Sequence, residues 1–207
     1  MKKRLYLLLA ILALISMSAC TSTLQYNPAY EGRIQSAPGA LLEGRAVIYT
    51  TEAEDNYIFT GNPTSFTGAA TKISIPLGLI TKEISQNGFE RIFRDGAVLT
   101  RDLAAVNNYR VVVRPKVSNF SYAYNQLKNV GLLITPQTEI SLSIEVLDNS
   151  QRVIHANTFS SGVKDGDSYM MSGNPTDRIN RLVHEVITEL VNQATSEVYY
   201  LLQNRQT

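Results

Sequence analysis

The C-terminal part of the chain carries one long apolar stripe with helical spacing. Asn174 can cap a helix, Pro175 suits its first turn, and Asp177 suits the positive end of its dipole. The apolar positions then recur every three or four residues. They are Ile179, Leu182, Val183, Val186, Ile187, Leu190, Val191, Ala194, Val198, Leu201 and Leu202. Because an apolar helix face must be buried, the stripe predicts a long helix packed on a sheet.

Alternating residues earlier in the chain predict that sheet. Residues 140–146 alternate between apolar and polar side chains, which is typical of a strand with one buried face. Residues 148–151 predict a hairpin turn, and residues 152–160 predict the return strand. A further strand is expected over residues 109–125, in which Pro115 indicates an edge position or a bulge.

Shorter elements precede these strands. Residues 46–50 predict a first strand, and the polar residues 51–71 predict a long loop. A helix is expected over residues 76–86, with a stop signal at residues 87–88, and a strand over residues 89–94. We therefore expect an α+β fold, in which an antiparallel sheet of about four or five strands carries one short and one long helix on one face.

The N-terminus has the parts of a secretory signal peptide. Residues 2–4 are basic, residues 5–15 are apolar, and small residues lead to Cys20. This apolar run is shorter than the roughly 20 residues that a membrane-spanning helix needs. Residues 1–19 are therefore predicted to be removed, which changes the formal charge from +1 to −2, since they hold three basic residues and no acidic one. This charge gives no reason to expect nucleic acid as a partner.

Residues 17–20 (MSAC) resemble the lipobox of bacterial lipoproteins, although that family usually has Leu, Val or Ile where Met17 stands. The resemblance implies that Cys20 is acylated and becomes the N-terminus of a membrane-anchored protein. Thr21, in place of Asp, implies release to the outer membrane in Gram-negative members, with the protein facing the periplasm. The alternative is an ordinary secreted protein with an exposed thiol.

The mature chain is predicted to contain a tether and one domain. Residues 21–44 are rich in Ser, Thr, Pro and Gly and have no sustained periodicity. Residues 20–44 are accordingly predicted to form a lipidated tether, and residues 45–207 a single α+β domain.

The sequence carries no recognisable catalytic or metal-binding motif. His155 and His184 are the only histidines, neither lies in a motif, and both are expected to be structural or solvated. Cys20 is the only cysteine, so ordinary zinc spacings are excluded. Residues 165–168 (DGDS) lack the third acidic position and the closing Glu of a calcium loop. We therefore expect no enzyme activity, no metal and no cofactor.

One group of aromatic residues suggests a binding face. Phe120, Tyr122 and Tyr124 alternate along a predicted strand and so share one side of it. Tyrosines offer apolar area with a polar hydroxyl, which suits contacts with a glycan, a lipid or a protein. Alternating aromatic residues are also common in cross-strand core packing, which is the competing interpretation.

The order of these features resembles a known family. Cys20, a strand, a helix ending at residues 86–89 (QNGF) and a strand pair over residues 118–122 and 138–142 are similar to the YajG family of small outer-membrane lipoproteins. The lipopolysaccharide-assembly lipoprotein has a similar order, but its aromatic segment after the Cys is replaced here by residues 21–24 (TSTL). Neither resemblance implies a catalytic residue.

Three functions follow as hypotheses. The first is a lipid-anchored, non-enzymatic accessory or interaction subunit of an envelope assembly, with other envelope proteins or a second copy of the chain as partners. The second is a module that binds glycolipid or lipopolysaccharide on the face formed by Phe120, Tyr122 and Tyr124. The third, an envelope hydrolase, needs His155 or His184 in a pocket beside an acid and a Ser.

Overall fold

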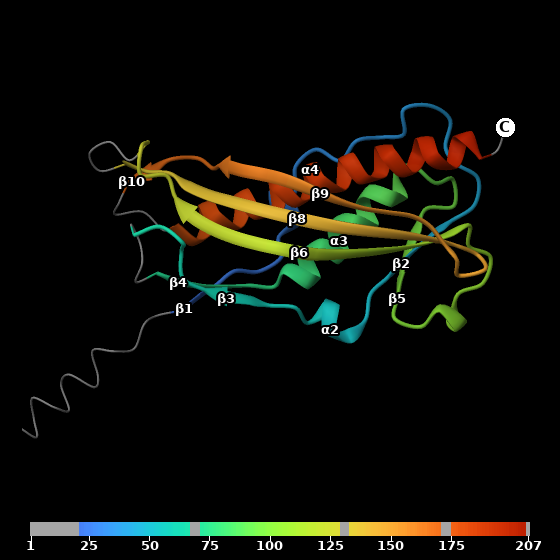
Figure 1. Cartoon of the computed structure of the whole chain (residues 1–207), viewed down its shortest axis with the longest axis horizontal. Coiled ribbons are helices and arrows are strands. Elements are labelled where there is room, and N and C mark those ends of the chain that lie inside the picture. Colours follow the sequence, from blue (N-terminus) through green and yellow to red (C-terminus); the bar gives the residue numbers. More distant parts are fainter. Residues whose placement is uncertain (1–20, 67–70, 129–132, 171–174, 206–207) are drawn as a thin grey trace, which may run out of the picture.

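The computed structural model describes residues 21–66, 71–128, 133–170 and 175–205, and it has the expected α+β fold (Figure 1). The central sheet has five strands in the order β5-β2-β6-β8-β9. These strands are β2 (Ala46–Tyr49), β5 (Ala97–Thr100), β6 (Val111–Tyr124), β8 (Pro136–Asp148) and β9 (Val153–Asp165). Strand β2 pairs in parallel with β5 and β6, whereas β6, β8 and β9 pair antiparallel. The sheet is therefore mixed, not antiparallel throughout as the sequence predicts.

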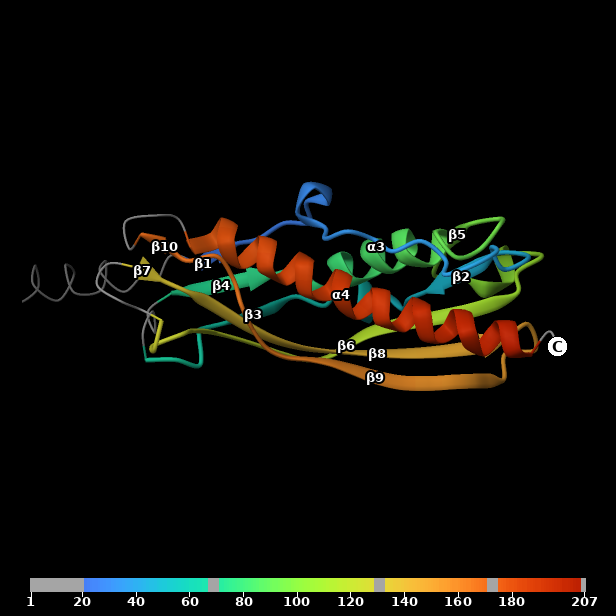
Figure 2. The ribbon, with the colours of Figure 1, turned by 90° about the horizontal axis from the view of Figure 1, so that it is seen from above.

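Two small sheets and the helices complete the described fold. One small sheet has the order β1-β4-β3, and the other pairs β10 with β7. The small strands are β1 (Thr21–Thr23), β3 (Phe59–Gly61), β4 (Lys72–Ile75), β7 (Leu133–Ile134) and β10 (Tyr169–Met170). The helices are η1 (Pro28–Tyr30), α2 (Glu52–Asp55), α3 (Leu77–Glu90), η2 (Leu103–Ala105) and α4 (Pro175–Asn204). Figure 2 shows α3 and α4 on the same side of β6, β8 and β9.

Helix α4 packs as its stripe predicts. Leu182, Val186 and Leu190 are buried, and α4 contacts β8 and β9. The apolar residues at the even positions of β8, from Ile140 to Val146, are buried as well. The long helix and the clearest strand of the sequence therefore form the two halves of one core.

Pro115 lies within β6, where the strand loses one of its neighbours. The pairing of β6 with β2 ends at Val113, while Pro115 faces Ile144 of β8. The predicted irregularity is a register shift between Val117 and Asn119. This shift moves the buried side chains of β6 from the odd positions to the even ones, because an extra residue reverses the faces of a strand.

Helix α3 continues beyond the stop signal that the sequence predicts. A Cβ added at Gly88 would lie 2.5 Å from Val191 Cγ1, so this glycine allows α3 and α4 to approach closely and does not end the helix. The helix runs on to Glu90, and the strand predicted over residues 89–94 is wrong. Part of that segment instead contacts the N-terminal region through a bridge between Phe93 and Leu42.

The segment predicted as a loop, residues 51–71, contains α2 and β3 in its described part. Thr51 caps α2 in a capping box: its side chain accepts from the Glu54 N–H, and the Glu54 carboxylate accepts from the Thr51 N–H. Strand β2 is found where it is predicted. Its neighbour in the sheet, β5, is not predicted from the sequence.

Residues 21–44 do not form a free tether. This segment, which we call the N-terminal strap, begins as β1 beside β4 and then runs over α3 and α4 on the side away from the main sheet (Figure 2). Its Leu24 and Leu42 side chains are buried in the core. The predicted boundary at Arg45 is therefore wrong for the fold, because the strap contributes apolar side chains and hydrogen bonds that composition alone does not show.

Candidate functional site

The strap is held by a row of polar side chains on α4. These side chains, which we call the polar ladder, follow one another at intervals of four residues on one face of the helix. They are Asn180, His184, Thr188 and Asn192. All four are buried, yet each one hydrogen-bonds to a backbone group of the strap. A buried polar group is tolerated when it is paired in this way, and these hydrogen bonds hold the strap against α4.

The first half of the ladder fixes the role of one histidine. Asn180 Nδ2 donates to the Gln25 carbonyl at 2.9 Å, and the Asn27 N–H donates to His184 Nε2 at 3.1 Å. His184 Nδ1 lies 2.8 Å from the Asn180 carbonyl, which requires the proton on Nδ1. Burial lowers the pKa of His184, and a neutral ring suits both contacts. His184 is therefore a structural residue, as the sequence analysis expects.

The second half of the ladder makes the most complete contact. The Gly32 N–H donates to Thr188 Oγ1 at 3.2 Å. The Asn192 side chain uses both of its polar atoms: Nδ2 donates to the Arg33 carbonyl and Oδ1 accepts from the Gln35 N–H, each at 2.9 Å. Because Asn192 pairs with backbone groups on both sides of Ile34, it fixes the position of this part of the strap on α4.

The predicted aromatic binding face is buried. Phe120, Tyr122 and Tyr124 are all buried, and the Phe59 ring of β3 lies 4.6 Å from the Phe120 ring, measured between the ring centroids. The Tyr122 hydroxyl donates to the Thr71 carbonyl at 2.7 Å, and burial raises its pKa. Core packing is therefore the right interpretation of these residues, and they cannot form a surface for glycolipid or lipopolysaccharide.

The other predicted site residue, Cys20, lies outside the described residues. Its neighbour Thr21 is the first residue of β1 and pairs with Lys72 of β4. No residue separates the predicted lipid attachment point from the folded domain. The second histidine, His155, lies with its Nε2 atom 3.1 Å from the Glu197 carboxylate of α4. This contact joins β9 to α4.

A pocket that the sequence analysis missed lies between α2, α3 and β6. Its volume is about 310 Å³, and its lining is mainly apolar. Ala53 and Tyr57 line it from the α2 side, Pro115 and Val117 from β6, and Thr81 from α3. The Thr81 hydroxyl is almost fully buried and has no hydrogen-bond partner among the described residues. Because the pocket is mainly apolar and is formed by three separate elements, it is a candidate site for a small ligand.

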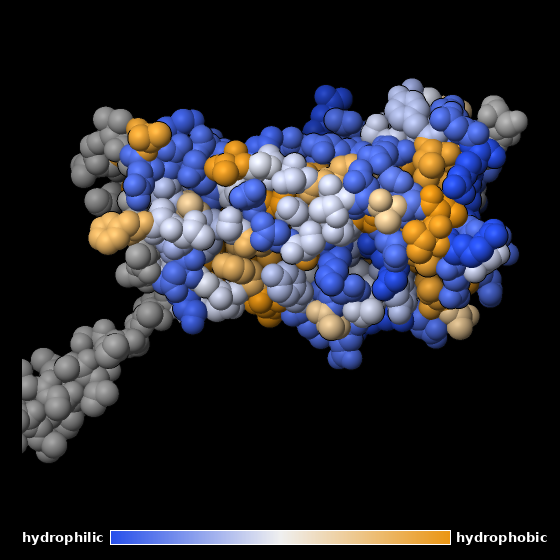
Figure 3. All heavy atoms as spheres, viewed as in Figure 1, coloured by the Kyte–Doolittle hydropathy of each residue, from blue (hydrophilic) through white to orange (hydrophobic). Residues whose placement is uncertain are grey.

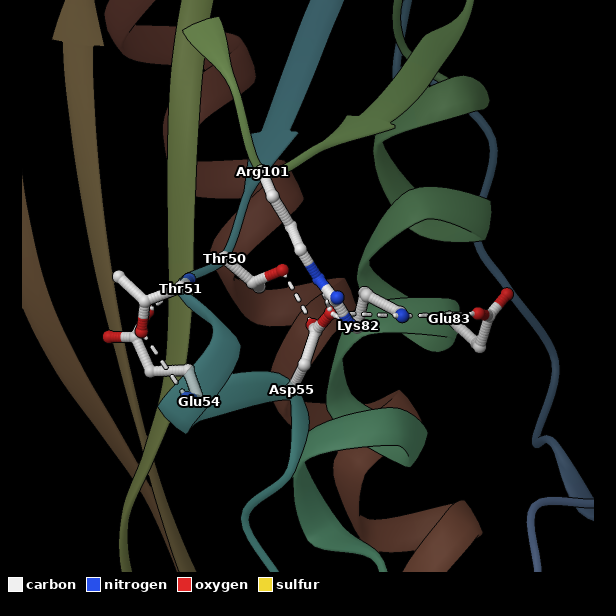
Figure 4. Close-up of polar contacts among 7 residues, drawn as sticks. All are labelled: Thr50, Thr51, Glu54, Asp55, Lys82, Glu83 and Arg101. Atoms are coloured by element: carbon white, nitrogen blue, oxygen red, sulfur yellow. Dashed lines mark hydrogen bonds and ion pairs between the residues drawn. The ribbon is translucent and has the colours of Figure 1, made fainter.

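A buried carboxylate stabilises the wall of this pocket (Figure 4). Asp55, the last residue of α2, accepts from Thr50 Oγ1 at 2.6 Å and from Arg101 Nε at 2.6 Å. Lys82 Nζ of α3 lies 3.5 Å from the same carboxylate. Burial acts to raise the pKa of Asp55, but the hydrogen bonds from Thr50 and Arg101 and the charge of Lys82 lower it overall. The cluster thus ties α2 to α3 and to the segment after β5.

The close packing of α2 explains why sequence analysis missed the pocket. A Cβ added at Gly78 would lie 1.9 Å from the Glu54 carbonyl, so α2 and the start of α3 are in backbone contact. The pocket residues come from three separate segments, and no local pattern brings them together. The one available signal was the Thr51-x-x-Glu54 spacing, which is typical of a helix start inside the presumed loop.

The described residues show two further absences. They include no group of three or more His, Cys, Asp or Glu side chains placed to hold a metal ion. Within the same part of the chain, neither α3 nor α4 is both long and apolar enough to span a membrane.

Comparison with known proteins gives similarity at the level of structure. No protein-family model and no curated protein sequence matches the chain. A Xanthomonas campestris protein of the family model DUF330 matches 91% of this chain and 99% of its own, with 15% identity and a TM-score of 0.52. The minor lipoprotein of Acinetobacter baumannii matches 78% of this chain and 94% of its own, with 16% identity and a TM-score of 0.38.

A third solved structure is the PelC L103M dodecamer from Paraburkholderia phytofirmans, with 16% identity and a TM-score of 0.39 over 82% of this chain and 94% of its own. The two scores below 0.5 support no conclusion about this chain. The first similarity shows that the chain shares its α+β fold with the Xanthomonas campestris DUF330 protein. Because identity is so low, this likeness concerns the fold alone, and function has to be argued from the residues.

Proposed function

We propose that this chain is a lipid-anchored outer-membrane lipoprotein that faces the periplasm and acts as a non-enzymatic accessory or interaction subunit of an envelope assembly. The observation that carries the proposal is the position of Cys20, directly before the first residue of β1. The segment with the features of a lipoprotein signal ends where the fold begins, so removal of residues 1–19 leaves the whole described fold intact. The resemblance of the sequence to the YajG family of outer-membrane lipoproteins supports the same proposal.

The non-enzymatic part of the proposal rests on the use of the ionisable side chains. His184 is committed to the strap and His155 to Glu197. Asp55 is enclosed by Thr50 and two cations, so it lacks a free position for a substrate. Each of these groups therefore has a structural task, and we assign the chain to binding and assembly.

The anchor is tested by the variant Cys20→Ser. In cells, wild-type protein should fractionate with the outer membrane and should carry acyl groups on Cys20 when measured by mass spectrometry. The variant should lose both properties, while Ser22→Ala, two residues further on, should keep them. A Cys20→Ser protein that still fractionates with the outer membrane like the wild type would refute the anchor.

The pocket supports a second candidate function, the binding of a small amphipathic molecule. The observation in its favour is the mainly apolar pocket of about 310 Å³, which Glu54 and Lys116 also line. A ligand with an apolar body and one polar group would fill the pocket and place its polar group beside these charged residues. This site would replace the aromatic strand face as the place where a lipid-like ligand binds.

A fluorescent apolar probe, N-phenyl-1-naphthylamine, tests the second function. The variant Ala53→Trp places a large ring in the pocket and should abolish the fluorescence increase on binding. The matched control is Glu52→Trp, because Glu52 lies on the same helix, is exposed and does not line the pocket. Equal probe binding by both variants would show that the probe does not enter this pocket.

A further inference from the structure

We infer that one end of the domain is a lipid-contacting surface, which inserts apolar side chains into the membrane beside the acylated Cys20. The inference rests on the proposed function, because it takes the lipid anchor as given. We call this surface the apolar tip and define it by Phe66, Leu127, Leu133 and Met170. Insertion of the apolar tip would give the domain a fixed orientation on the membrane.

The members of the apolar tip are unusually exposed for large apolar residues. Phe66 is 90% exposed and Leu127 is 94% exposed, the two highest values among the exposed large apolar side chains of the described residues. Leu133 and Met170 face each other in the β7–β10 pair and are 42% and 52% exposed. A group of exposed apolar side chains at one place indicates an interaction surface.

Contacts of the backbone bring these separate loops to one end of the sheet. Ser65, next to Phe66, accepts from the Tyr124 N–H at the end of β6. Two residues before Leu127, the Asn125 N–H donates to the Thr135 carbonyl, which follows β7. Three loops that are far apart in sequence therefore meet where β6 ends and β8 begins.

The predicted lipid attachment point lies at the same end. Thr21 pairs with Lys72, and the neighbouring Thr71 carbonyl accepts from the Tyr122 hydroxyl near the end of β6. Cys20 is one peptide unit from Thr21, so the two Cα atoms are about 3.8 Å apart. Both ribbon views place β1, β4, β7 and β10 together at one end of the molecule (Figures 1 and 2). Figure 3 shows apolar side chains at this end and a band of apolar side chains near the opposite end.

A lipid surface is the partner of the apolar tip, because the anchor on Cys20 keeps the tip close to the membrane. With no tether, acyl chains on Cys20 would hold β1 at the bilayer, and apolar side chains beside it would meet lipid before any other partner. Lys128 at this end lies 2.6 Å from Asp165, so these two charges neutralise each other. The exposed apolar side chains are therefore expected to supply most of the binding.

The test uses the full, acylated protein on vesicles of phosphatidylethanolamine and phosphatidylglycerol. Since Cys20 is the only cysteine and its thiol is acylated, one added cysteine can be labelled selectively with a polarity-sensitive fluorophore. The labelled positions are Leu127→Cys and Met170→Cys. The matched control is Val153→Cys, an exposed apolar residue (54%) in the β8–β9 hairpin at the opposite end.

Lipids with a nitroxide on the acyl chain should quench the label at positions 127 and 170 and leave the label at position 153 unchanged. Labels at 127 and 170 that are shielded from water but not quenched by these lipids would overturn the inference, because a protein partner would then cover the tip. Equal quenching at all three positions would overturn it too. If flotation shows that the protein does not bind the vesicles, the proposed lipid anchor itself fails, and a bound protein without quenching refutes the apolar tip alone.

Discussion

The polar ladder makes a quantitative prediction at Asn192. Replacing Asn192 by Ala removes two hydrogen bonds of 2.9 Å, one to the Arg33 carbonyl and one from the Gln35 N–H. Each such bond contributes about 0.5–1.5 kcal/mol to stability, so the variant should lose about 1–3 kcal/mol of unfolding free energy. Urea unfolding of the chain that starts at Thr21, followed by circular dichroism, measures this loss.

The same variant should also release the strap locally. The Arg33 carbonyl that Asn192 holds belongs to the peptide bond after Arg33, so trypsin should cleave this bond faster in Asn192→Ala than in the wild type. The matched control is Gln193→Ala, because Gln193 is the next residue of α4 and is exposed. If the two variants unfold at the same urea concentration and are cleaved at the same rate, the ladder does not hold the strap.

Three further predictions concern α4 and the pocket wall. Leu190→Ala should cost about 2–5 kcal/mol in urea unfolding and more than Leu182→Ala, since Leu190 is fully buried, whereas Glu185→Ala should change little. Burial lowers the pKa of His184 in the folded state below the ordinary 6.5, so the unfolded chain binds the extra proton and wild-type stability should fall as the pH drops below about 6.5. The unfolding free energy of His184→Gln should depend less on pH in this range. An unchanged slope of this free energy against pH would contradict the prediction. Asp55→Asn should lose about 1–3 kcal/mol at neutral pH, and because the folded pKa of Asp55 is lowered, its deficit relative to wild type should vanish in acid once that carboxyl is protonated.

The large elements of this fold could be predicted because their signals are local and periodic. The stripe of α4 and the alternation of β8 each determine which face is buried, and burial in the structure follows both. The parallel pairing of β2 with β5 and β6 has no such signal, because it joins segments that are distant in sequence. Sequence therefore indicates the elements and their faces better than it indicates their order in the sheet.

The errors have two physical causes. Gly88 carries the usual signal of a helix end, yet here its missing side chain makes room for Val191 of the neighbouring helix. The strap has the composition of a linker because its stability comes from backbone hydrogen bonds to the ladder, and backbone groups are the same in every sequence. The pocket was missed for the same reason as the strap: its shape depends on a backbone contact, here between Gly78 and Glu54, which no side-chain pattern reveals.

Removal of the whole strap gives the decisive test of where the domain begins. A chain of residues 45–207 lacks Leu24 and Leu42, whose burial contributes about 1.5–3 kcal/mol each, and leaves the four ladder side chains without their partners. Since small domains are stable by only about 5–15 kcal/mol, this chain should lose its fixed core packing and its near-UV circular dichroism. A synthetic peptide of residues 21–44 should restore that signal, because the strap docks on a helix face that is formed mainly by local contacts. If residues 45–207 unfold at the same urea concentration as residues 21–207, the strap is a tether after all, and a lipid on Cys20 would no longer fix the orientation of the domain on the membrane.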